Sequence, residues 1–139
     1  MNNPSKAVYD EADFCGKAGF DFLDLTIEGP CATNVDIDRL RPILDSYGLS
    51  ITGHTDPCLP YAYPIQGVRE ACFMELERCA GIFFALGAKV MNIHPCYFCP
   101  PAMRKDLVSF LIEALPPIIS GSEPRVYSGT LGVMSTTQA

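Results

Sequence analysis

The two stretches that decide the fold read Leu49-Ser50-Ile51-Thr52-Gly53-His54 and Lys89-Val90-Met91-Asn92-Ile93-His94. Each has the length of a β-strand, follows a glycine that can end a helix, and finishes on one of the chain's two histidines. A loop rich in proline and cysteine comes directly after each of them. Imidazole is the commonest metal ligand and titrates near neutral pH. The matching positions therefore predict either one shared site or two histidines that each cap a strand end.

The segments around these stretches alternate between helical and strand-like patterns. Helices are expected at residues 4–18, 38–47, 65–86 and 102–115, and strands at residues 20–28, 49–54, 89–94 and 130–134. The first helix is expected to begin at Asn3-Pro4, with the asparagine as N-cap. The second is expected to start late enough to keep Pro42 in or near its first turn. Such alternation predicts a parallel sheet built from right-handed crossovers.

Every expected strand has one apolar face and one small or polar face. In the first strand, for example, Leu23, Leu25 and Ile27 alternate with Asp24, Thr26 and Glu28. A doubly wound sheet buries both faces and is typically apolar throughout. One-sided polarity instead favours part of a (β/α)₈ TIM barrel, in which the active site lies at the C-terminal ends of the strands. The candidate catalytic residues at those ends are Glu28, His54 and His94.

The composition sets limits on the class of protein. With 139 residues, 48% of them hydrophobic and 19% charged, the chain has the size and apolar content of one globular domain. The net charge of −6 disfavours a general nucleic-acid binder or a protein of anionic membrane surfaces. No apolar run could span a bilayer, and the first residues lack the apolar stretch of a signal peptide. We therefore expect a cytoplasmic protein whose seven cysteines are reduced thiols.

Three stretches of this sequence resemble one known family. Residues 19–25, 47–54 and 86–95 look like the xylose isomerase-like TIM-barrel superfamily, which includes sugar-phosphate isomerases and epimerases and the endonuclease IV-type enzymes. The resemblance extends from about residue 4 to residue 137. A complete family barrel has eight strands and about 250 residues. The resemblance therefore implies that residues 1–139 form a single partial TIM-barrel domain, equivalent to the second to fifth strands.

By resemblance, the function is that of a sugar or sugar-phosphate isomerase or epimerase. His54 and His94 would bind a divalent metal (Zn, Mn or Mg) or contact the small-molecule sugar, and Glu28 would act as acid or base or simply be solvated. The set of metal ligands is incomplete, because Met134 stands where the family commonly has a glutamate. The fragment by itself is therefore predicted to be either an isomerase or an inactive relative. Its unclosed edges predict a homo-oligomer or a complementing half-barrel.

Two further functions remain open. One is an endonuclease IV-like zinc phosphodiesterase, which the two histidines favour and the acidic balance disfavours. The other is a non-catalytic truncated or interaction fragment, which the short length and Met134 favour.

Several side chains near the two histidines have alternative interpretations. Asp56 would either support His54 from behind or stabilise the turn before Pro57, and Asp24 is expected to be a hydrogen-bonded structural carboxylate inside the barrel. Tyr61 and Tyr63 would stack on a sugar or pack on the surface. The pair Cys96 and Cys99 would help to bind zinc or have no special role.

Overall fold

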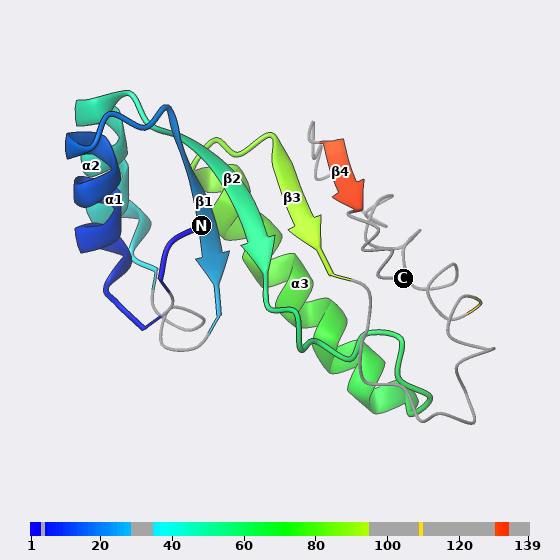
Figure 1. The fold of residues 1–139 in the computed structure, drawn as a ribbon. Helices are drawn as coiled ribbons and strands as arrows, with labels where there is room; N and C mark the ends of the chain where they lie inside the picture. The colour runs from blue at the N-terminus through cyan, green and yellow to red at the C-terminus, as the bar shows by residue number, and fades with distance from the viewer. Residues whose placement is uncertain (4, 29–34, 95–108, 110–129, 134–139) are drawn as a thin grey trace, which may run out of the picture.

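The computed structural model describes residues 1–3, 5–28, 35–94, 109 and 130–133, the last four by their backbone alone. Its elements are α1 (Val8–Lys17), β1 (Phe22–Ile27), α2 (Ile37–Tyr47), β2 (Ser50–Thr55), α3 (Gln66–Ala85), β3 (Val90–Ile93) and β4 (Thr130–Val133) (Figure 1). The predicted alternation is confirmed from α1 to β3, and β4 forms where a strand was expected. The helix expected at residues 102–115 lies outside the described residues, except for residue 109. No helix in the described ranges is long and apolar enough to cross a membrane.

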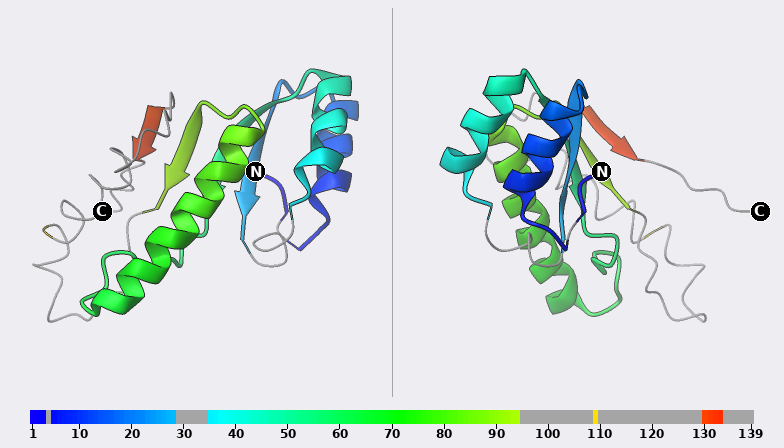
Figure 2. Two further views of the ribbon diagram at one scale, coloured as in Figure 1. Left: turned by 180° about the vertical axis from the view of Figure 1, so that it is seen from behind. Right: turned by 60° about the vertical axis from the view of Figure 1, so that its left-hand side comes forward.

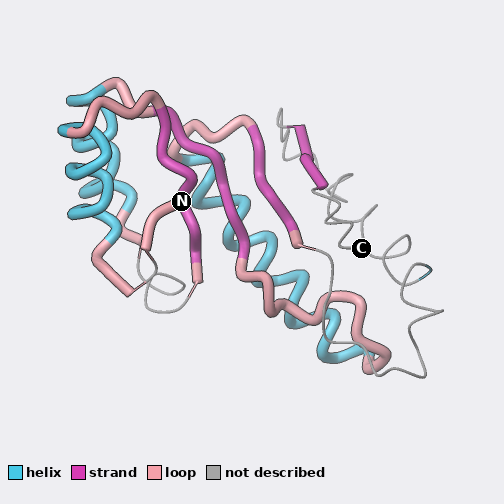
Figure 3. Tube along the Cα trace, viewed as in Figure 1, coloured by secondary structure: helices cyan, strands magenta, loops and turns pink. Residues whose placement is uncertain are grey.

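The strands form one parallel sheet in the order β1-β2-β3-β4 (Figure 3). β1 and β2 pair along their whole length, from Phe22 opposite Ser50 to Ile27 opposite Thr55. β2 and β3 pair over a short stretch, where Gly53 is opposite Met91 and His54 is opposite Asn92. Because successive strands are neighbours and each crossover from β1 to β3 contains a helix, the architecture is that of a partial TIM barrel, as the sequence predicts.

The three helices lie on one side of β1 and β2 (Figure 2). The strand residues that face them, including Leu23, Leu25 and Ile51, are buried in one apolar cluster with Leu40 and Phe83. The opposite face carries Asp24, Thr52 and His54, which are half-buried. The predicted division into an apolar and a polar face is therefore confirmed, and it leaves the polar side chains on the face that a closed barrel would enclose.

The start of α1 differs from the prediction. The helix begins at Val8 rather than at Asn3-Pro4. The Asn3 side chain accepts a hydrogen bond from the backbone N–H of Ser5 at 2.9 Å, which closes a local turn in place of a helix N-cap. Just before it, the backbone N–H of Asn2 donates to the carbonyl of Asp24 at 3.2 Å. The first residues are thus held against β1, and the helix can start only after the chain has turned away from the sheet.

The prediction for Pro42 is wrong. α2 begins directly after its N-cap, Asp36, so Pro42 lies in the helix interior rather than in the first turn. The proline cannot donate to the carbonyl four residues earlier, and this costs the helix one hydrogen bond. The Asp36 cap, the burial of Leu40 and Leu44, and a left-handed Gly48 (φ 65°) at the C-terminal end hold the helix together. Tertiary packing here outweighs the local preference of proline.

Candidate functional site

The two histidines meet at the C-terminal ends of β2 and β3. His54 lies near the end of β2, His94 follows β3 directly, and their Nε2 atoms are 2.5 Å apart. The ring centroids are separated by 4.6 Å and the ring planes are inclined by 37°. Both residues are half-buried. Of the two arrangements that the sequence allows, the structure has the one in which the two imidazoles lie together.

A carboxylate lies behind the first histidine. Asp24 Oδ2 is 3.1 Å from His54 Nδ1, and the two side chains are only 20% and 13% exposed. A carboxylate accepts hydrogen bonds, so Nδ1 of His54 carries a proton in this contact. In the 2.5 Å contact between the two Nε2 atoms, one ring must then donate to the other. The result is a chain of three groups, Asp24, His54 and His94, that share two protons.

The second histidine is held through its backbone and is neutral. The hydroxyl of Tyr61 donates a hydrogen bond to the His94 carbonyl, while the Tyr61 ring is buried in a cluster with Leu76 and Ile93. Burial lowers the pKa of His94, and the nearby His54 lowers it further. Tyr61 therefore packs in the interior, at 3% exposure, rather than on the surface as one of its two predicted roles had it. At neutral pH the His94 ring is uncharged and can accept a proton or bind a cation.

The two acidic residues at this rim have different surroundings. Glu28 is half-buried just after β1, and its negative charge acts to raise the pKa of His94. Asp56 uses its side chain within its own loop, where Oδ1 accepts from the backbone N–H of Cys58 at 2.7 Å. Of the two predicted roles of Asp56, turn stabilisation is thus the one seen. The pair Cys96 and Cys99 lies outside the described residues.

Sequence reasoning placed Asp24 inside the barrel but missed its partner. Asp24 is opposite Thr52 in the ladder, and His54 is the next residue of β2 on the same face. The diagonal contact between Asp24 and His54 follows from the register of the two strands. That register, in which Asp24 is opposite Thr52, cannot be read from the sequence. Asp56 is nearer in sequence, but its position in the loop turns it away.

The N-terminal residues make a further contact that the sequence did not indicate. Asn2 is 2% exposed, and its Oδ1 accepts from the backbone N–H of Thr26 at 2.6 Å, beside β1. Three buried polar atoms in this region have no hydrogen-bond partner in the described part of the chain: Asn2 Nδ2, Asp24 Oδ1 and Thr26 Oγ1. Such atoms are uncommon in folded proteins. The polar face therefore has unused hydrogen-bonding capacity on the strand that carries Asp24.

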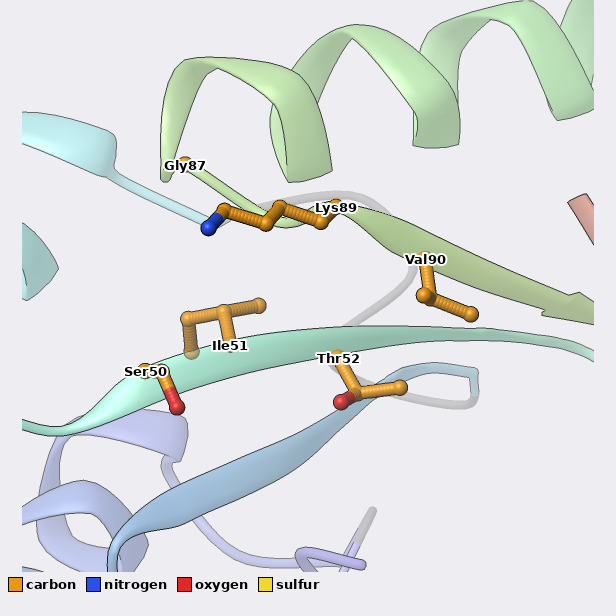
Figure 4. Close-up of a pocket in the computed structure, with 6 residues that line it drawn as sticks. All are labelled: Ser50, Ile51, Thr52, Gly87, Lys89 and Val90. Carbon is orange, nitrogen blue, oxygen red and sulfur yellow. The ribbon is translucent and has the colours of Figure 1, made fainter. Parts of the chain in front are cut away.

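A cavity of about 230 Å³ lies away from the histidines, between the N-terminal parts of β2 and β3 (Figure 4). It is lined by Ser50, Ile51, Thr52, Gly87, Lys89 and Val90. The two strands diverge here, because their ladder begins only at Gly53. None of the predicted site residues lines this cavity. The N-terminal end of a barrel contributes to stability rather than catalysis, so the histidine pair is the better candidate site.

Comparisons with known proteins identify the fold. No protein-family model and no curated protein match the chain. Among solved structures, a D-tagatose 3-epimerase-like protein matches with a TM-score of 0.70 and 22% identity, over 82% of this chain and 43% of that protein. The D-psicose 3-epimerase of Clostridium cellulolyticum H10, solved with D-tagatose, matches with a TM-score of 0.74 and 13% identity, over 91% and 46% of the two chains. A xylose isomerase-like TIM-barrel protein of Mycobacterium smegmatis, solved with magnesium, matches with a TM-score of 0.59 and 16% identity, over 91% and 45%.

These similarities confirm the predicted resemblance at the level of the fold. The chain has the architecture of xylose isomerase-like and sugar 3-epimerase barrels. It spans less than half the length of each of the three structures. The alignment therefore accounts for one part of a barrel.

The fold raises the question of a divalent metal, and the donor atoms limit which metal fits. Magnesium prefers six oxygen ligands, whereas imidazole nitrogen suits zinc. Two imidazoles on one tetrahedral zinc stand about 3.4 Å apart, given a Zn–N distance of about 2.1 Å. Nε2 of His54 and His94 would thus have to separate by about 1 Å from their present contact. Within the described ranges, no group of three or more His, Cys, Asp or Glu side chains is arranged to hold a metal. After such a separation, the pair would supply two of the four ligands of a zinc ion.

Proposed function

We propose that this chain is one part of a sugar or sugar-phosphate isomerase or epimerase barrel, and that Glu28, His54 and His94 belong to its active site. The observation that carries this proposal is the meeting of His54 and His94 at the C-terminal strand ends of a sheet with a 3-epimerase fold. In TIM barrels the reacting groups are supplied from those ends. A small-molecule sugar is the expected ligand, since one of the matching epimerases was solved with D-tagatose.

The side chains at this rim have the properties that the reaction needs. Isomerisation and epimerisation move a proton on a carbon next to a carbonyl group, so they require a base with an available lone pair. His94 is neutral because burial lowers its pKa, and the Nδ1 contact of His54 with Asp24 leaves Nε2 of His54 as an acceptor. Glu28 is the carboxylate of the set. These three groups would bind the sugar hydroxyls and exchange protons with them.

A divalent metal belongs to the same proposal. His54 and His94 would supply two of its ligands through Nε2, and the remaining ligands would come from residues beyond this pair. When bound, the metal would polarise the carbonyl and hydroxyl oxygens of the sugar. Nitrogen donors favour zinc over magnesium at this pair.

The partial barrel also implies a complementing partner. In the described part of the chain, the edge of β1 pairs only with the Asn2 segment, and none of the helices α1 to α3 covers the polar face. We propose that a second copy of the chain or a separate half-barrel covers this face. Size-exclusion chromatography with light scattering is the direct measurement, and a dimer is the expected result.

The test of the function combines binding and turnover. We expect zinc to raise the melting temperature of the purified chain, and D-tagatose or D-psicose to be epimerised by the complete assembly. His54→Gln and His94→Gln should abolish both effects, whereas Asp38→Asn on the exposed side of α2 should change neither. A folded chain that binds neither zinc nor ketohexose and gives no turnover would refute the proposal.

One observation favours the phosphodiesterase alternative. The paired imidazoles are better zinc ligands than magnesium ligands, as a zinc phosphodiesterase requires. The net charge of −6 counts against a DNA-binding groove. Cleavage of DNA containing abasic sites by the zinc-loaded chain, without ketohexose epimerisation, would assign the site to this alternative.

A further inference from the structure

We propose that Asp24 is a positioning residue that fixes the ring of His54 as the Nδ1-protonated tautomer and thereby presents an unprotonated Nε2 to the site. The inference rests on the proposed role of His54, but it concerns a proton position that exists whether or not the chain is an enzyme. It assigns to Asp24 a task that neither the fold similarity nor the sequence pattern gives it.

The argument begins with the geometry of the contact. Asp24 Oδ2 lies 3.1 Å from Nδ1 of His54, and both side chains are largely removed from solvent. A partly buried ring nitrogen next to a carboxylate must donate, because the alternative tautomer would place two acceptors against each other. The other nitrogen, Nε2, points to His94. In a neutral ring, a proton on Nδ1 thus leaves Nε2 as a hydrogen-bond acceptor.

The backbone around Asp24 explains why this carboxylate keeps a fixed position. The residues on either side of it, Leu23 and Leu25, are buried in the core. The backbone carbonyl of Asp24 also accepts a hydrogen bond from the backbone N–H of Asn2. The second oxygen, Oδ1, is buried without a partner in the described part of the chain. Since no other hydrogen bond in that part of the chain engages this oxygen, the carboxylate can orient toward the imidazole of His54. Its unpaired oxygen also indicates that the group is not optimised for stability alone.

The consequence is a restriction on the ligand. An unprotonated Nε2 can accept a hydrogen bond from a hydroxyl group or bind a cation, but it cannot donate to an oxygen acceptor. Once it has parted from His94, this nitrogen would therefore select hydroxyl-bearing ligands or a metal such as zinc. Carboxylates that lie behind histidine ligands act in the same way in metal sites, where their removal typically weakens metal binding by about 10–100-fold.

The chain is well suited to a direct test, because it contains two histidines only. Long-range ¹H–¹⁵N correlation spectra of the metal-free protein report which nitrogen of each ring is protonated. His94→Gln leaves a single imidazole and so assigns the His54 signals. We expect His54 to be protonated at Nδ1 in the wild-type protein and in His94→Gln. Asp24→Ala should convert it to a mixture or to the Nε2–H form, and Asp24→Glu should restore the original tautomer at least in part.

Asp56→Asn is a matched control, because Asp56 is another carboxylate near the site and its side chain accepts a hydrogen bond from Cys58 in its own loop. It should leave the His54 tautomer unchanged. An Nε2-protonated His54 in the wild-type spectrum would overturn the proposal without any variant. An unchanged tautomer in a folded Asp24→Ala protein would also overturn it. Zinc titration separates the two levels of inference. If His54 has the expected tautomer but the protein binds no zinc, the proposed metal site is wrong and the role of Asp24 stands. If zinc binds and its affinity is about 10–100-fold weaker in Asp24→Ala, both proposals are supported.

Discussion

The substitution Gly53→Ala tests how the sheet and α3 together position the histidine site. Gly53 precedes His54 in β2, and a methyl group built on it would lie 2.4 Å from Cδ2 of Phe83. Carbon atoms in contact are normally about 3.5 Å or more apart, so the ring would have to retreat by about 1 Å. Phe83 is 2% exposed and packed within the core, which leaves it no free space. We expect the free energy of unfolding to fall by about 1–3 kcal/mol, as for other overpacked cores.

The measurement is urea denaturation followed by far-UV circular dichroism. Gly81→Ala is the control, because it lies in α3 with no atom within 4 Å of the added methyl group. It should stabilise the chain by about 0.5–1 kcal/mol. Phe83→Leu combined with Gly53→Ala should lose less than the sum of the single variants, since the smaller side chain makes room for the methyl group. A Gly53→Ala protein as stable as the wild type, or strictly additive losses, would refute the packing of Phe83 against β2.

Three other predictions concern single contacts. Tyr61→Phe should lower the free energy of unfolding by about 1 kcal/mol, because it leaves the His94 carbonyl without its donor; an unchanged urea midpoint would contradict that bond. A hydrogen bond from Lys17 lowers the pKa of Asp13, so the stability it contributes is present above the unfolded-state pKa and is lost as the pH falls through the lowered folded-state pKa. Melting temperatures of wild type and Asp13→Asn should therefore converge in acid and differ at pH 6. Burial raises the pKa of the Cys79 thiol to about 12, so this residue should not react with a thiol reagent at pH 8 until the chain unfolds, which mass spectrometry of labelled peptides would show.

The fold was predictable because its signals are local. The alternation of Leu23, Leu25 and Ile27 with polar residues identifies the strand and its core face, and Gly48 marks the end of α2 through its left-handed conformation. Such patterns depend on neighbours within a few residues. The start of α1 and the position of Pro42 were predicted wrongly, because contacts distant in sequence decide them. Asn2 binds to β1, and the burial of Leu40 and Leu44 keeps α2 helical through its proline.

The candidate site was predictable in part for the same reason. His54 and His94 could be assigned to one edge, because parallel strands end at the same side of a sheet. The pairing of Asp24 with His54 depends on the register between β1 and β2, and the bond from Tyr61 to His94 depends on the path of a loop. Neither is encoded in a short pattern. The catalytic roles of Glu28, His54 and His94 remain proposals that rest on their placement.

The polar face of the sheet limits what can close this barrel. Asp24, Thr52 and His54 are half-buried on a face that an eight-stranded barrel would enclose completely. Covering them with apolar side chains would leave polar groups without partners, at a cost of about 1–3 kcal/mol for each group. A partner that packs an ordinary apolar surface here would therefore destabilise the assembly. A complementing half of the kind proposed would have to bring donors for Asp24 and ligands or hydroxyl groups for the histidines, so that closing the barrel and completing the site would be one event.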